Sequence, residues 1–345
     1  MPTIGPASLY GLHELAFRTQ YAELKDRARA AGALLPGTPG VLYERRGTGH
    51  AYWYRVYYST PGRQSEELVG GASDEPALQA ARDQIDFAGW VSRQVSDLRK
   101  LQFQVADKST ARVLVELHNK GVFESGLMLV GTLSYMAWLN ELGARATALR
   151  TQDIDLARRQ SLKLAAPLPF LEMLQSTRLP FAAVPGLPGE TASSSVKLPG
   201  REGLRIDLLA PGSRLGSPVR IPELQWHAQA VPHYDYLLDQ PVRAAALAGG
   251  HCIPIRLPRV ERWVWHKLYS SALRQGFPEK AEKDLLQAAT LAAVLTERDE
   301  NEVLTDSISD APAAVRAAAR KRLPALRRTL ASHPQTLEQF ERGLS

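Results

Sequence analysis

One stretch of the sequence, LMLVGTLSYMAWLNELG, constrains the fold more than any other. The apolar run Leu127–Gly131 is typical of a buried strand, and the residues after Thr132 have the composition and length of a helix. A glycine at such a junction lets a phosphate group approach the backbone closely. The helix start adds N–H groups without partners and the positive end of the helix dipole. The sequence therefore predicts a strand–turn–helix unit whose turn suits a phosphate.

Three aspartates follow this unit at informative positions. Asp153 and Asp155 alternate within TQDIDLA, and Asp207 stands alone in the apolar segment LRIDLLA. Alternate side chains of a strand share a face, so Asp153 and Asp155 project together, and Asp207 joins them if its strand lies alongside. Converging carboxylates repel one another unless cations neutralise them, and oxygen ligands select Mg²⁺ or Mn²⁺. Two such ions are the arrangement used for in-line phosphoryl transfer.

The order of these motifs, hG[ST]…hDhDh…h[DE]h with h an apolar residue, resembles the DNA polymerase β-like nucleotidyltransferase superfamily. The segments LVGTLSYMAWLNELG and TQDIDLA look like its bacterial branch of uncharacterised nucleotidyltransferases. A later pattern, HKL…R…KAEKDLLQA, resembles the helical motif of the related abortive-infection and toxin nucleotidyltransferases. The resemblance spans about residues 40–300. Two features depart from the family pattern: Thr132 stands where serine is commoner, and the gap from Thr132 to Asp153 is long.

The resemblance implies a role for each matching residue. Asp153, Asp155 and Asp207 would be the catalytic metal ligands, and Asp207 would also help to deprotonate an acceptor hydroxyl. Five residues would bind the nucleotide: Gly131, Thr132, Lys267, Lys283 and Asp284. The implied cofactor is Mg²⁺ or Mn²⁺.

The fold class expected from these elements is α+β, with a polymerase β-like core of a mixed sheet and flanking helices. Residues 1–105 are expected to hold a helix over 8–32, a three-stranded meander and a long helix over 73–105 that Ser73 caps. Residues 106–256 would form the nucleotidyltransferase core, and residues 257–345 a helical region. A length of 345 residues suits about two domains, and 44% hydrophobic residues exclude global disorder.

The charge of the chain is basic, but its distribution leaves two interpretations open. The net charge is +6, and the 42 Lys and Arg residues are mostly arginine. Six of them, with no acid between, lie in residues 311–332. That segment either presents a basic helix face to a phosphate backbone or is a solvated helix rich in arginine by composition. The aromatic meander around Tyr52–Tyr58 either stacks bases or, as we favour, packs on a core.

Several classes of protein are excluded or disfavoured. Cys252 is the only cysteine, so the chain has no internal disulfide, and the histidine spacings provide no zinc motif. The sequence has no P-loop. No apolar run is long enough to cross a membrane, and the first residues do not resemble a secretion signal. A cytoplasmic location without membrane contact is expected.

The function expected is transfer of a nucleotidyl group from an NTP to an acceptor hydroxyl, with release of pyrophosphate. RNA or tRNA is a candidate acceptor, and a toxin or defence role with an antitoxin or other protein partner is one of the interpretations that stay open. The alternative is a nucleic-acid-binding or interaction protein on a catalytically decayed nucleotidyltransferase core. The intact aspartate trio argues against decay.

Overall fold

A mixed sheet forms the centre of the molecule. The computed structural model describes residues 8–60, 62–147, 151–185, 192–274, 276–299 and 302–345. The main path of the sheet runs through β11 (Pro218–Ile221), β12 (Trp226–Val231), β10 (Arg205–Pro211), β7 (Asp153–Arg158) and β5 (Leu127–Val130); β9 (Ser195–Lys197) also pairs with β10, and β8 (Ala182–Ala183) with β9. Strand β10 is parallel to β7 and β12, whereas β5 is antiparallel to β7. The predicted α+β class with a mixed sheet agrees with this arrangement.

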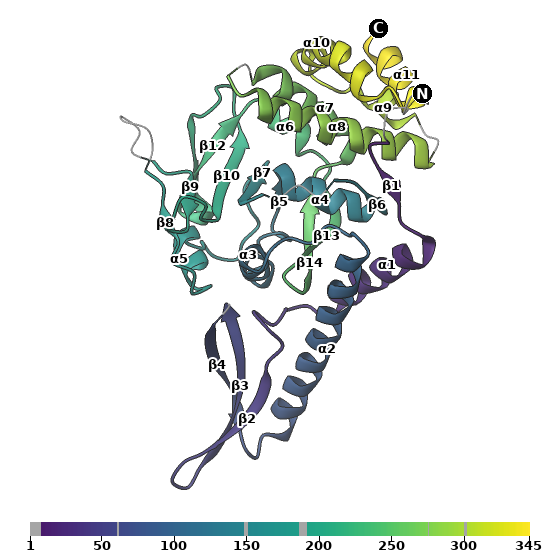
Figure 1. Cartoon of the computed structure of the whole chain (residues 1–345). Coiled ribbons are helices and arrows are strands. Elements are labelled where there is room, and N and C mark those ends of the chain that lie inside the picture. The colour runs from purple at the N-terminus through teal and green to yellow at the C-terminus, as the bar shows by residue number, and fades with distance from the viewer. Residues whose placement is uncertain (1–7, 61, 148–150, 186–191, 275, 300–301) are drawn as a thin grey trace.

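Helices and a second hairpin surround the sheet (Figure 1). They are α3 (Lys108–Asn119), α4 (Gly131–Glu141), α5 (Phe170–Gln175), α6 (Tyr234–Leu237), α7 (Val260–Leu273), α8 (Pro278–Asp299) and the hairpin of β13 (Val242–Ala248) with β14 (His251–Leu257). Alternate strand residues such as Ile154, Leu156 and Ile206 are fully buried. Trp263 of α7 is also buried and stacks on Tyr135 of α4. One apolar core therefore holds the sheet, α4 and α7 in fixed positions.

The N-terminal residues form a separate sheet carried by a long helix, at the lower end of Figure 1. The elements are β1 (Gly11–Leu12), α1 (Leu15–Ala30), the meander of β2 (Val41–Arg46), β3 (Ala51–Thr60) and β4 (Arg63–Gly71), and α2 (Glu75–Lys100). The three-stranded meander is confirmed. The first helix is shorter than predicted because residues 11–12 pair as β1 with β6 (Ala144–Arg145).

The predicted N-cap of α2 is wrong by one residue. Asp74, not Ser73, caps the helix, and its Oδ1 accepts a hydrogen bond from the Ala77 N–H at 3.1 Å. A carboxylate satisfies an unpaired N–H and also complements the helix dipole, so the acid is the better cap.

The two faces of the meander differ in burial. Arg55 and Tyr57 are buried at 3% and 7% exposure, whereas Tyr52 and Tyr58 on the other face are exposed at 41% and 52%. The favoured packing role thus holds for the face that carries Arg55 and Tyr57.

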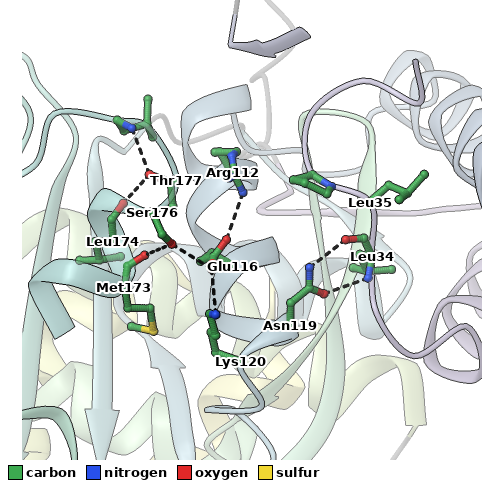
Figure 2. Close-up of polar contacts among 12 residues, drawn as sticks. Leu34, Leu35, Arg112, Glu116, Asn119, Lys120, Met173, Leu174, Ser176 and Thr177 are labelled. Atoms are coloured by element: carbon green, nitrogen blue, oxygen red, sulfur yellow. Dashed lines mark hydrogen bonds and ion pairs between the residues drawn. The ribbon is translucent and has the colours of Figure 1, made fainter. Parts of the chain in front are cut away.

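Helix α3 ties the N-terminal region to the core (Figure 2). The Asn119 side chain accepts from the Leu34 N–H at 2.9 Å and donates to the Leu34 carbonyl at 2.8 Å. One turn earlier, Glu116 accepts from Arg112 at 3.4 Å and from the Ser176 hydroxyl at 3.0 Å. These contacts fix the loop before the meander and the end of α5 on the same helix.

The C-terminal helices are α9 (Val303–Ser307), α10 (Ala313–Thr329) and α11 (Pro334–Leu344). The arginines of α10 bind groups of this chain: Arg316 donates to the Ala311 carbonyl, Arg320 to the Leu344 carbonyl and Arg327 to Glu341. In the described part of the chain, no helix has the length and apolar character needed to cross a membrane.

Candidate active site

Three segments distant in sequence meet at one edge of the central sheet. The end of β5 pairs with the start of β7, because Val130 lies opposite Asp155. The start of β10 lies parallel to the start of β7 on its other side, with Asp207 opposite Asp155 and Arg205 opposite Asp153. Since paired residues of neighbouring strands share a face, Asp153, Asp155 and Asp207 project from the same face of the sheet. The expected adjacency of the two aspartate strands is therefore present.

Asp155 is the central carboxylate of this face. Its side chain makes no hydrogen bond or ion pair with any described residue. Burial, then the charge of Asp207, raises the pKa of Asp155 to about 7, although Lys267 and Arg274 act in the opposite direction. A carboxyl with a pKa this far above its usual 3.8 lies where burial and neighbouring negative charge together disfavour its ionised form.

Asp207 is held by two neighbours that sequence reasoning missed. Its Oδ1 accepts from Arg205 Nε at 2.8 Å and from the Ser195 hydroxyl, and Arg205 Nη2 also donates to Ser195 Oγ at 2.8 Å. Asp207 Oδ2 has no such contact within the described residues. One oxygen is thus fixed, and the other remains available.

Gly131 lies directly against the carboxylate of Asp155. Its φ is +68°, and a Cβ built on it would lie 1.9 Å from Asp155 Oδ2. Both facts require glycine, because an L side chain is strained at this φ and would collide with the acid. Helix α4 begins at Gly131 with no side-chain cap, and Thr132 in its first turn is 8% exposed. The N–H groups in the first turn of α4 therefore lie beside the acidic face.

Helices α7 and α8 bring cations toward the acids. Lys267 Nζ lies 2.6 Å from Asp284 Oδ1, and Arg274 Nε lies 2.9 Å from Asp284 Oδ2. The pKa of Lys283 is lowered by burial and then by Lys267, while Asp284, Asp153 and Asp155 counteract the shift. The predicted residues Lys267, Lys283 and Asp284 thus form one cluster, and Asp284 acts there as the buried partner of two cations.

The remaining wall behind Asp155 is aromatic. Tyr234 is buried, and burial followed by the charges of Asp155 and Asp284 raises the pKa of its hydroxyl far above the usual value. Its ring packs edge-on against His266 with centroids 5.1 Å apart. Burial lowers the pKa of His266 to about 4, so this histidine is a neutral core residue.

The donor set suits a hard divalent cation in part. Asp155 and Asp207 contribute carboxylate oxygens without internal partners, and such oxygens match Mg²⁺ or Mn²⁺. Among the described residues, no three His, Cys, Asp or Glu side chains are gathered closely enough to form a ready-made metal cage. Mg²⁺ usually takes one or two protein carboxylates and completes its shell with water and substrate phosphates, so the two facing acids fit that mode.

A comparison with known families agrees with this geometry. The profile of a family described as nucleotidyltransferase matches residues 108–312, which is more than half of the chain. The chain belongs to this nucleotidyltransferase family. The match contains β5, α4, the three aspartates and the α7–α8 cluster. No curated protein and no solved structure matched the chain.

The family membership supports nucleotidyl transfer in general terms. It does not extend to the abortive-infection or toxin branch that the sequence resembles, and the roles of the individual site residues stay predictions. Of the residues that sequence reasoning missed, Arg205 carried a signal, because it stands two positions before Asp207 and so shares its face. Ser195 carried none, since its contact depends on β9 pairing with β10.

Proposed function

We propose that the protein is a divalent-metal-dependent enzyme that transfers a nucleotidyl group from an NTP to an acceptor hydroxyl and releases pyrophosphate. The observation that supports this most directly is the pairing of Asp155 with Asp207 beside Gly131. Two carboxylates on one face and an uncapped helix start next to them are what a cation–triphosphate complex requires.

The nucleotide side of the proposed site is formed by α4, α7 and α8. The N–H groups in the first turn of α4 have no side-chain cap and suit phosphate oxygens. Lys267 and Lys283 supply positive charge toward the same face, and Asp284 holds Lys267 in position. A triphosphate bound here would have its negative charge balanced from two directions.

The chemistry assigned to the residues is a substitution at the α-phosphorus. The acceptor oxygen forms a bond to phosphorus, the bond to the bridging oxygen breaks, and pyrophosphate leaves with the electron pair. The hydroxyl proton passes to water, and Asp207 assists by accepting a hydrogen bond from the hydroxyl at Oδ2, the oxygen that has no partner among the described residues. Ser195 and Arg205 keep that carboxylate in position through Oδ1.

The proposed cation sites are Asp155 and Asp207, with Asp153 at the exposed start of β7 as the third ligand. A bound divalent cation would neutralise charge on the phosphates and lower the pKa of the attacking hydroxyl. Asp155 without a cation carries uncompensated charge, which is consistent with its raised pKa.

The test is pyrophosphate release on incubation with each NTP, Mg²⁺ and total cellular RNA. We expect release by the wild type and a loss of about a thousandfold or more in Asp153→Asn, Asp155→Asn and Asp207→Asn. The isosteric change removes charge and leaves the shape of the side chain. Asp86→Asn, an exposed acid of α2, is the matched control.

A thermal unfolding curve for each variant shows that it is folded. Folded Asp155→Asn and Asp207→Asn proteins that retain Mg²⁺-dependent release would refute the assignment. Salt-sensitive RNA binding without any turnover in the wild type would favour the alternative of a decayed, nucleic-acid-binding core.

A further inference from the structure

A large open cavity lies outside the residues assigned so far. Its volume is about 1090 Å³, and it is lined by β1, β6, the end of α2 with the segment that follows it, one side of α4 and the residues before β7. Several lining groups are polar and exposed, among them Arg99, Gln102, Arg145 and Gln152. Leu133 and Met136 of α4 add an apolar surface. A space of this size accepts a nucleotide-sized ligand, since small-molecule sites commonly measure about 300–1,000 Å³.

The charge in this cavity is positive and has no internal counterpart. Neither Arg99 nor Arg145 has a side-chain hydrogen bond or ion pair within the described residues. The one carboxylate that the described residues place in the lining, Asp107, is already engaged, because it caps α3 through the Thr110 N–H at 2.7 Å and the Thr110 hydroxyl at 3.2 Å. The cavity therefore offers two guanidinium groups to an anion from outside.

The positive charge of Arg145 also affects the pKa of a neighbouring histidine, His13. His13 is buried and stacks on Phe103, a lining residue, with ring centroids 3.9 Å apart. Burial, then the charges of Arg145 and Arg18, lowers the pKa of His13 to about 4. His13 is accordingly neutral at physiological pH and adds no charge to the cavity.

The cavity and the catalytic face share parts of the chain. Thr151 and Gln152 line the cavity and lead directly into Asp153, and the Thr151 hydroxyl accepts from the Asp153 N–H at 3.2 Å. The Gln152 carbonyl accepts from the Arg205 N–H at 2.8 Å, which joins the cavity rim to β10. On the other wall, Leu133 follows Thr132 in the first turn of α4. The cavity thus borders the residues that lead into Asp153 and the first turn of α4, and α7 and α8 contribute none of its described lining residues.

We propose that this cavity binds the acceptor, and that the acceptor carries a phosphate which Arg99 and Arg145 recognise. The word acceptor rests on the proposed function, whereas the binding of a phosphate-bearing ligand does not. Arginine suits phosphate because its planar fork donates two parallel charge-assisted hydrogen bonds. The amide side chains of Gln102 and Gln152 can donate to and accept from a base or a ribose in the same space. The end of a single-stranded RNA and a free mononucleotide share this chemistry.

The test is direct binding to the full-length protein, measured by fluorescence anisotropy with a short 5′-labelled single-stranded RNA and by competition with AMP. We expect Arg99→Gln and Arg145→Gln each to weaken binding of the RNA about tenfold. The double variant should also flatten the dependence of log K on log salt by about 0.7, the value for one phosphate on a single strand that is no longer neutralised. Arg93→Gln is the matched control, because Arg93 is exposed on α2, the same helix as Arg99, and is not among the cavity-lining residues.

The comparison of RNA binding with competition by AMP identifies which ligand supplies the phosphate. Tight RNA binding with weak competition by AMP assigns the cavity to an RNA end, and equally strong competition by AMP assigns it to a mononucleotide; both support the proposal. Equal binding and equal salt dependence in the wild type, the double variant and Arg93→Gln would overturn it.

The failure of this proposal can be told from the failure of the proposed function. If the wild type shows no nucleotidyl transfer but binds RNA, and the double variant loses that binding, the cavity assignment is supported and the enzymatic function is refuted. If transfer occurs and the KM for the acceptor is the same in the double variant as in the wild type, the enzymatic function is supported and the cavity assignment is refuted. The thermal unfolding midpoints of the variants confirm that each protein is folded.

Discussion

The acidic face of the central sheet and the basic helix α10 differ in whether their charged side chains have partners within the chain. On the sheet, Asp155 has no partner among the described residues and Asp207 keeps one oxygen unengaged. On α10, Arg316 and Arg320 bind backbone carbonyls of their own chain, and Arg327 pairs with Glu341 at 2.8 Å. The first region keeps its charge available to a ligand, and the second uses its charge to join helices.

The comparison separates the number of charges from their availability. Residues 311–332 contain the densest run of cations, yet several of those cations already have partners in the fold. Arg99 and Arg145 lie outside that run, yet they face a cavity and have no internal partners in the described part of the chain. For this chain, a charged residue without a partner is a better indication of a ligand site than a charged run.

Among variants that keep all three aspartates, Gly131→Ala is expected to have the largest effect, because it displaces the available charge of Asp155 without removing it. The new Cβ would collide with Asp155 Oδ2 and displace the carboxylate. A displacement of about 1 Å in a catalytic group can cost about a hundredfold in rate, so we expect a loss of at least that size. The rate of pyrophosphate release measures it.

The control for this change is Gly121→Ala. Gly121 has nearly the same φ, +69°, but nothing lies within 4 Å of the place that a Cβ would take there. It therefore reproduces the backbone strain without the collision. Equal losses of activity in the two variants would show that strain alone, and not contact with Asp155, is responsible.

A smaller effect is expected on the free energy of unfolding, and it tests whether the charge of Asp155 is in fact unpaired. Removing an unpaired and largely desolvated charge should stabilise the protein, so Asp155→Asn should raise the free energy of unfolding at pH 8, in chelator, by roughly 1–3 kcal/mol. The pKa of Asp155 is about 7 in the folded protein and near 3.8 when unfolded, so only the unfolded state is ionised between these values. The wild type should therefore lose stability as the pH rises from 4 to 7.

Urea unfolding of both proteins at pH 4 and at pH 8 measures this difference. The gain from Asp155→Asn should be present at pH 8 and nearly absent at pH 4. A gain of equal size at both pH values would mean that Asp155 does not carry an uncompensated charge.

The smallest effect is expected on α10. Arg327→Gln removes an exposed ion pair with Glu341, and such pairs contribute about 0.2–1 kcal/mol at most. We expect a loss of stability below about 0.5 kcal/mol, with no change in RNA binding or in pyrophosphate release. A several-fold loss of RNA affinity in this variant would instead support the interpretation that α10 binds nucleic acid.

Local sequence patterns were sufficient to predict that the three aspartates share one face of the sheet. The strand before Gly131, the alternation of Asp153 and Asp155, and the apolar neighbours of Asp207 are all features of short segments. The adjacency of the two aspartate strands followed from one further assumption, that these strands pair, and their register agrees with it.

Other parts depend on contacts that no local pattern encodes. Asp284 binds Lys267 across two helices, and Ser195 reaches Asp207 only through strand pairing. The described lining of the cavity combines residues 8–11, 99, 102–107, 145–147 and 151–152, and the short pairing of β1 with β6 brings two of these segments together. A two-residue strand has no periodicity to detect, so neither β1 nor the cavity could be predicted.

The central claim is that this acidic face transfers a nucleotidyl group, and the most direct measurement follows labelled phosphorus. The protein is incubated with Mg²⁺, total RNA and NTP labelled either at the α- or at the γ-phosphate. The account predicts that the α-label enters the acceptor while the γ-label is released in pyrophosphate, and that Asp207→Asn abolishes both. Transfer of the γ-label to the acceptor, or incorporation of the α-label that Asp207→Asn leaves unchanged, would contradict it.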